Sequence, residues 1–212
     1  LLLSSAALSA QASFINLMAE ANSDERGVTL LDLDGEGLTS FDLDIEGWAG
    51  ATLVHAYLDD NNAGLGVCQT GLGGGDGEHC IDAADDNVDK SGEFLKLIFN
   101  EAMIISGLWF NSNHDAGDME GNNVAIDGGN YMFTAADADN AGGALAGVNH
   151  KYNGLMSFDA GDTLTLGFVD QQFYLSAIEI SDPVNVPTPG GLALFGLAMA
   201  ALGWTRRRRL AA

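Results

Sequence analysis

Hydrophobic and polar residues alternate in short runs along most of the chain. Within residues 39–45, Phe41, Leu43 and Ile45 alternate with polar side chains, two of them aspartates. Successive side chains of a β-strand point to opposite faces, so this run predicts a strand with one buried face. Gly, Asn and Asp separate such runs, as they do in turns. We expect strands at 28–33, 39–45, 52–58, 94–99, 104–110, 124–126, 131–134, 154–158, 163–169 and 173–180.

The last of these runs carries apolar residues on both faces. Leu175 and Ala177 fall on one face, and Ile178 and Ile180 fall on the other. This pattern indicates an inner strand that is covered on both sides. Only residues 13–22 have a helical composition. Many short strands with polar turns predict an all-β fold: a single β-sandwich, jelly-roll-like, over residues 13–186.

Charge is distributed very unevenly. The 212 residues contain 8 Lys and Arg against 30 Asp and Glu, and four of the basic residues are Arg206 to Arg209. The rest of the chain therefore holds four basic residues against all the acids. Such a body repels nucleic acid and attracts cations, so we expect no nucleic-acid partner.

Both ends of the sequence resemble targeting segments. Residues 1–12 are apolar, then small, and end in Ala10-Gln11-Ala12, the small-x-small pattern that precedes a signal-peptidase cut. We expect them to be the remnant of a signal peptide. Near the other end, residues 190–204 form an uncharged apolar stretch that precedes the arginines. A helix of this length spans about 22 Å, a minimal transmembrane helix, with the arginines on the cytoplasmic side.

Val186-Pro187-Thr188-Pro189 precedes this apolar stretch, and the C-terminal segment as a whole resembles the PEP-CTERM sorting signal. Thr188 stands where Glu is usual in that family. The resemblance covers residues 187–209 together with Val186, and it implies processing by a membrane-embedded exosortase in a bacterium that makes exopolysaccharide. The protein would be exported, anchored in the inner membrane through its C-terminus, and then placed at the cell surface or in the extracellular matrix. The residues of the signal are Val186, Pro187, Thr188, Pro189, Arg206, Arg207, Arg208 and Arg209.

Cys68 and Cys80 are the two cysteines of the chain, and a glycine-rich segment separates them. Exported proteins fold in oxidising compartments, so this even pair predicts one disulfide. Two free thiols are the alternative. The loop-entropy relation assigns such a bond about 3 kcal/mol of stability.

Two loops are dense in oxygen-bearing side chains. Calcium takes six to eight oxygen ligands, so both loops are candidate calcium sites, although neither follows the order of an EF-hand. The alternative is that these acids are solvated turn residues. The metal candidates are Asp82, Asp85, Asp86 and Asp89 in the first loop and Asp115 and Asp118 in the second, which also contains Asn111, Asn113, His114, Glu120 and Asn122.

Sequence signatures of catalysis are absent: the chain has neither a Gly-x-Ser-x-Gly nor a His-Glu-x-x-His motif. We therefore expect a structural or adhesive surface or matrix protein rather than an enzyme. A calcium-dependent carbohydrate-binding module is the alternative, since aromatic side chains can stack on sugars. Trp48 is expected in an exposed turn and Trp109 in the core; the other candidates are Tyr57, Tyr131 and Tyr152.

Overall fold

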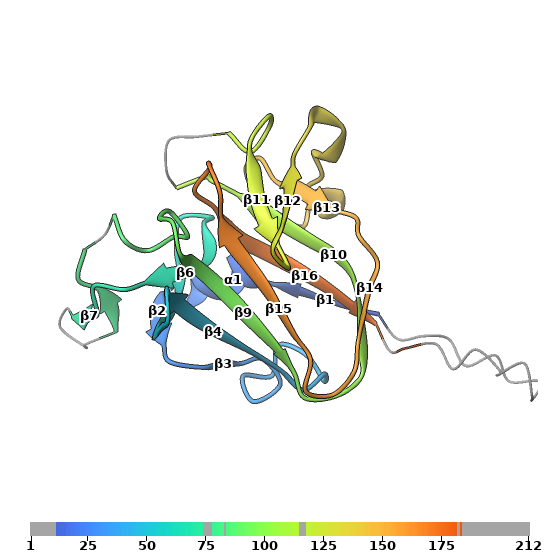
Figure 1. Cartoon of the computed structure of the whole chain (residues 1–212), viewed down its shortest axis with the longest axis horizontal. Coiled ribbons are helices and arrows are strands. Elements are labelled where there is room, and N and C mark those ends of the chain that lie inside the picture. The colour runs from blue at the N-terminus through green and yellow to red at the C-terminus, as the bar shows by residue number, and fades with distance from the viewer. Residues whose placement is uncertain (1–11, 74–77, 83, 115–117, 182, 184–212) are drawn as a thin grey trace, which may run out of the picture. The chain divides into compact units, whose positions relative to one another are not determined.

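The structure is a computed structural model that describes residues 12–73, 78–82, 84–114, 118–181 and 183. It is mostly β, as the hydrophobic pattern predicts (Figure 1). The elements are β1 Ala12–Asn16, α1 Leu17–Ser23, β2 Arg26–Val28, β3 Leu31–Asp32, β4 Leu43–Ala49, β5 Thr52–Asp59, β6 Gly64–Cys68, β7 Leu72–Gly73, β8 His79–Cys80, β9 Glu93–Phe99, β10 Met103–Asn111, β11 Asn123–Ile126, β12 Gly129–Met132, η1 Ala135–Asp137, η2 Ala141–Gly143, β13 His150–Tyr152, β14 Met156–Phe158, β15 Thr163–Phe168 and β16 Tyr174–Ser181.

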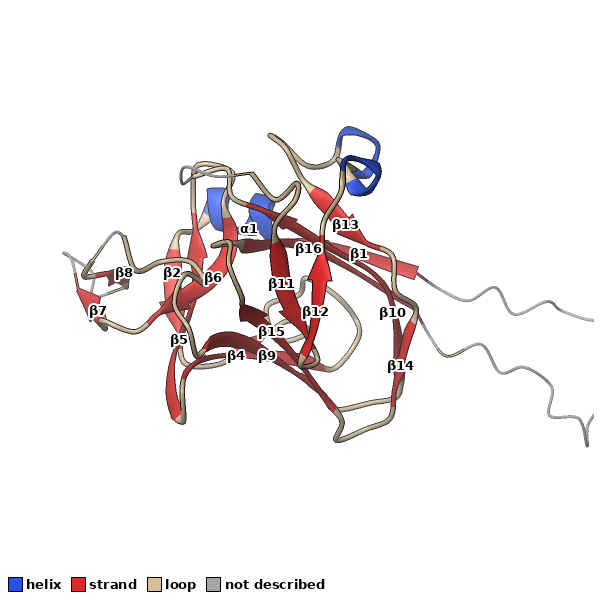
Figure 2. Ribbon diagram, turned by 45° about the horizontal axis from the view of Figure 1, so that its top comes forward, coloured by secondary structure: helices blue, strands red, loops and turns tan. Residues whose placement is uncertain are grey.

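One large antiparallel sheet dominates the fold. Its strands follow the order β12-β11-β15-β9-β4-β5-β6-β16-β10-β13. In addition, β1 pairs with β16, β2 with β5, β3 with β4 and β14 with β10. The β4–β5 hairpin joins the two halves, and the sheet curls so that β4, β9 and β15 lie in one layer and β16, β10 and β1 in another (Figure 2). Strands β7 and β8 form a separate small hairpin.

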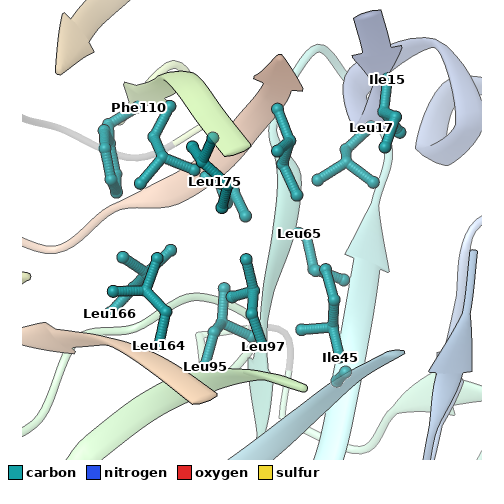
Figure 3. Packing of buried hydrophobic residues seen from close by; sticks show 14 of the residues in the cluster. Ile15, Leu17, Ile45, Leu65, Leu95, Leu97, Phe110, Leu164, Leu166 and Leu175 are labelled. Atoms are coloured by element: carbon teal, nitrogen blue, oxygen red, sulfur yellow. The ribbon is translucent and has the colours of Figure 1, made fainter. Parts of the chain in front are cut away.

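The core lies between the two halves of the curled sheet. Inward side chains of β9 and β15, such as Leu97 and Leu166, face side chains of β6, β10 and β16, such as Phe110 and Leu175 (Figure 3). All four are fully buried. Burying a side chain of this size stabilises the fold by about 2 kcal/mol, so the alternation of the sequence is what selects these faces.

A second, smaller core covers the outer face of β10 and β16. Trp109 and Ala177 pair across these strands and contact Met18 of α1 and Leu145. The ring of Phe14 lies edge-on to Trp109 at 5.2 Å between centroids. An irregularity in the pairing at Ser176 brings Leu175 into the main core with Ile178 and Ile180, so the expectation that Leu175 shares a face with Ala177 is wrong. Trp109 is buried, as predicted.

The helix expected at residues 13–22 begins later than predicted. Residues 13–22 were expected to be helical, but β1 occupies Ala12–Asn16 and α1 begins at Leu17. Ile15 pairs with Ile178 and is buried, and the side chain of Asn16 accepts a hydrogen bond from the Ala19 N–H, which starts the helix there. Sheet pairing and a cap therefore override the helical composition.

The strand expected at 39–45 is displaced along the chain. It begins at Leu43 and continues to Ala49 as β4, although Phe41, Leu43 and Ile45 are buried as predicted. Trp48 therefore lies within a strand rather than in an exposed turn. It is half-buried and pairs with Phe94 and Leu53 on the neighbouring strands.

The expected signal-peptide remnant lies outside the described residues except for Ala12, as do the sorting signal and the expected transmembrane helix at 190–204. In the described part of the chain, no helix has the length and apolar character that crossing a membrane requires.

Candidate metal-binding pocket

The two cysteines form the predicted disulfide. Cys68 at the end of β6 is bonded to Cys80 of β8, with 5.9 Å between their Cα atoms. The bond holds the β7–β8 hairpin against the main sheet. It also places Cys80 on the wall of a pocket that the acidic segments form.

Strand register brings distant residues to this end of the sheet. Asp59, the last residue of β5, pairs with Gly64, the first residue of β6. The next residue of β6 pairs with Leu175 of β16, and the adjacent Tyr174 pairs with Asn111 of β10. The polar ends of β5 and β10 therefore lie near each other, although about fifty positions separate them in sequence.

The first acidic loop divides into two groups, of which one surrounds a lysine. Asp85 and Asp89 lie with Glu93, and their carboxylate oxygens are within 4.8 Å of one another. The Lys90 ammonium forms ion pairs with all three, at 3.2 Å to Asp89 and 3.8 Å to Glu93. This ammonium supplies the positive charge that a metal ion would otherwise bring.

The surroundings of these carboxyls push their pKa values apart. Burial favours a raised pKa for Asp85, but its bonds to Lys90 and to the Thr70 N–H outweigh burial and lower the pKa. Burial raises the pKa of Glu93 to about 7, although the backbone N–H groups of Asp89 and Lys90 donate to its Oε2. The Oε1 atom of Glu93 is buried without a hydrogen bond.

Asp86 belongs to the second group, with Asp59 and His114. One potential ligand atom from each residue lies within 4.8 Å of the others. The Nδ1 atom of His114 contacts Oδ2 of Asp59, and the hydroxyl of Tyr174 donates to Oδ1 of Asp86 at 2.8 Å. Both aspartates are almost fully buried, whereas the side chain of His114 is 35% exposed. The cluster is thus closed on the protein side and reachable from solvent.

These three residues line a cavity of about 360 Å³. Its other polar walls include Glu25 and Tyr57, whose hydroxyl donates to Oε1 of Glu25, and His79, whose Nδ1 lies 3.3 Å from the same oxygen. Burial raises the pKa of Asp59, and the bond to His114 opposes this rise; burial and Glu25 together raise the pKa of Tyr57. The described lining is Glu25, Tyr57, Asp59, Asp60, Asn61, His79, Cys80, Asp86 and His114.

The remaining metal candidates from the sequence serve in turns or are not described. Asp82 is exposed and its Oδ1 accepts the Ala84 N–H, while Oδ1 of Asp118 accepts the Glu120 N–H. Asp115 lies outside the described residues. The predicted set is therefore not gathered at one point. Asp59 and Glu25 were missed; the only signal for Asp59 is the polar run 59–62 directly after an apolar strand.

The aromatic candidates lie in different places. Trp48 and Phe94 have parallel rings, 5° apart in plane and 6.1 Å between centroids, on the outer face of β4 and β9. Tyr131 packs edge-on against Tyr152 at 4.8 Å, and Tyr57 faces the cavity.

Comparison with protein-family models, curated proteins and solved structures yields no match for this chain.

Proposed function

We propose that this chain is an exported surface or extracellular-matrix protein with a structural or adhesive role. The observation that carries the proposal is the Cys68–Cys80 disulfide, since such bonds persist in oxidising compartments outside the cytoplasm. A strongly acidic body also suits a soluble protein among matrix polymers. We take the curled sheet, with its two halves facing across one core, to be a β-sandwich of jelly-roll-like form.

The C-terminal segment supports the proposed route. Val186-Pro187-Thr188-Pro189, the apolar stretch and Arg206 to Arg209 resemble a signal that an exosortase-type enzyme processes. Before processing, a helix at 190–204 would hold the chain in the inner membrane, with the arginines in the cytoplasm.

Cell fractionation tests this route. The full chain should reach the envelope of an exosortase-bearing bacterium in oxidised form and lose mass at its C-terminus. Replacing the four arginines by Gln should impair this processing, whereas replacing them by Lys, which keeps the charge, should preserve it. Deleting the gene in its host should weaken matrix cohesion. A full-length product with reduced thiols in the cytoplasm would rule the proposal out.

Carbohydrate binding is the second candidate, and the parallel pair of Trp48 and Phe94 favours it. Both rings are half-buried, so each leaves part of its surface open on the sheet. Lys96 lies over Trp48 at 5.4 Å and pairs with Glu46 at 3.3 Å, which places hydrogen-bonding groups beside the rings. Aromatic side chains present large apolar faces, on which a sugar ring could stack while polar groups nearby form hydrogen bonds with its hydroxyls.

Affinity electrophoresis in gels that contain exopolysaccharide tests this candidate. Retardation of the full chain should fall in Trp48→Ala but not in Leu53→Ala, because Leu53 is an exposed neighbour on the same face without a ring. Equal retardation of both variants would count against sugar stacking. Repeating the gel with EDTA shows separately whether binding depends on calcium.

A further inference from the structure

We propose that Asp59, Asp86 and His114 bind one divalent metal ion of the zinc class at the wall of the cavity. The three residues come from the end of β5, from the loop before β9 and from the segment after β10. Their potential ligand atoms already lie within 4.8 Å of one another. A tetrahedral ion with bonds of about 2.1 Å requires ligand atoms about 3.4 Å apart, a separation below this upper limit.

The charge balance of the cavity is the first argument for a cation. Four carboxylates line it, those of Glu25, Asp59, Asp60 and Asp86, and no Lys or Arg is among its described lining residues. Its two histidines each contact a carboxylate, His79 that of Glu25 and His114 that of Asp59. Asp59 and Asp86 are only 2% and 3% exposed. Buried carboxylates are costly unless a positive charge or a proton compensates them. A divalent cation would compensate two of them at once.

The rest of the chain offers no Lys or Arg for this purpose outside the C-terminal arginine cluster. The four other Lys and Arg residues all hold carboxylates elsewhere. Arg26 pairs with Glu20, Asp24 and Glu36; Lys90 pairs with Asp85, Asp89 and Glu93; Lys96 pairs with Glu46; and Lys151 pairs with Glu179. The acidic loop thus contributes to two clusters, and only the one built on Asp85 contains a lysine.

The donor set indicates which metal class fits. Calcium takes six to eight oxygen ligands, whereas an imidazole nitrogen with two carboxylates is a typical donor set for zinc. Three protein ligands leave the fourth tetrahedral position open toward the cavity, where water or a small anion could bind. The site therefore differs in both residues and metal from the calcium loops expected from the sequence.

Neighbouring groups hold the ligands in place. The hydroxyl of the fully buried Tyr174 donates to Asp86. Hydrogen bonds of this kind fix the orientation of metal-binding carboxylates. The loop that carries Asp86 lies directly on β6, since a Cβ at Gly66 would come within 2.1 Å of the Asp86 carbonyl oxygen. The backbone of this loop is thus fixed before any ion binds.

Titration calorimetry with zinc chloride, on the full chain stripped of metal and without a purification tag, tests the proposal. We expect one zinc ion per chain and an increase in Tm that grows with zinc concentration. His114→Gln should weaken zinc binding at least about 100-fold, because it removes a ligand rather than an outer neighbour. Asp82→Asn, which removes one exposed carboxylate from the same loop as Asp86, should leave zinc affinity unchanged. His114 is partly exposed, so its variant should fold normally.

Cobalt substitution identifies the ligand environment directly. Cobalt(II) in a four-coordinate site should give strong visible absorption that is lost in His114→Gln and kept in Asp82→Asn. The proposal is overturned if zinc does not bind, if both variants bind it equally, or if His79→Gln rather than His114→Gln abolishes binding. Tighter binding of calcium than of zinc would overturn the assignment of metal class.

Discussion

The carboxyl of Glu93 should make the stability of this protein depend on pH in an unusual direction. Glu93 begins β9, is 3% exposed, and has a pKa of about 7 in the folded chain against an ordinary value of 4.5. Burial is the main cause, and the neighbouring carboxyl of Asp89 adds to it by hydrogen bonding and by charge. The two backbone N–H groups that donate to Glu93 oppose the rise without cancelling it.

The sign follows from proton linkage. Between about pH 4.5 and 7 the folded state keeps a proton on Glu93 that the unfolded state has released, so the free energy of unfolding falls as pH rises. The contribution is fully present below pH 4.5 and is lost above about pH 7. A difference of this size corresponds to about 3 kcal/mol. Carboxylates that are ion-paired or hydrogen-bonded in their charged form have lowered pKa values and act in the opposite direction.

Glu93→Gln removes the titrating group but keeps an oxygen that can accept the N–H bonds of Asp89 and Lys90. We expect urea unfolding to show equal stability for the variant and the parent near pH 4, and a variant that is up to about 3 kcal/mol more stable near pH 8. Glu120→Gln, an exposed carboxylate in a turn, controls for the loss of one negative charge. Parallel stability curves for Glu93→Gln and its parent across this range would refute the reasoning.

Three further perturbations follow from the packing. Cys68→Ala/Cys80→Ala opens a loop of about 13 residues and should cost about 3 kcal/mol, seen as a loss of Tm that reductant reproduces in the parent but not in the variant. Gly66→Ala places a methyl against the loop backbone and should cost about 3 kcal/mol in urea unfolding, whereas Gly129→Ala, whose nearest atom is 3.5 Å away, should cost little. Arg26→Met leaves three carboxylates without their shared guanidinium and should lower stability by about 2 kcal/mol, less in high salt; an unchanged denaturation midpoint would contradict this.

The strands that the sequence predicts best are those whose pattern the core enforces. Residues 94–99, 104–110 and 163–169 agree with β9, β10 and β15 to within one or two residues, because their apolar positions face one interior. Strand β6 was missed because all five of its residues are buried. It shows no alternation, and two of its residues are glycines that let neighbouring segments approach closely.

The candidate site could be predicted only in pieces. Asp86 and His114 were each noted in a polar loop, but nothing local joins them to each other or to Asp59. Their meeting depends on the strand order β5-β6-β16-β10, which sequence periodicity does not determine. The same holds for Lys90: its position in sequence does not show whether it neutralises Asp85 or Asp86.

Whether Lys90 pairs with Asp85 or with Asp86 determines which of the two clusters can bind a metal ion from solution. Asp85 and Asp86 are neighbours in a segment of turns and bends, yet Asp85 contacts Lys90 whereas Asp86 lines the cavity. A short acidic run can therefore supply one carboxylate to a cluster that contains a lysine and the next carboxylate to a cluster that contains neither Lys nor Arg. Counting acids in a loop, as a sequence-based calcium prediction does, cannot separate the two. The contacts of each carboxylate with Lys and Arg do separate the two clusters. In this chain they indicate that a metal ion binds at Asp59, Asp86 and His114 rather than in the acid-rich turns.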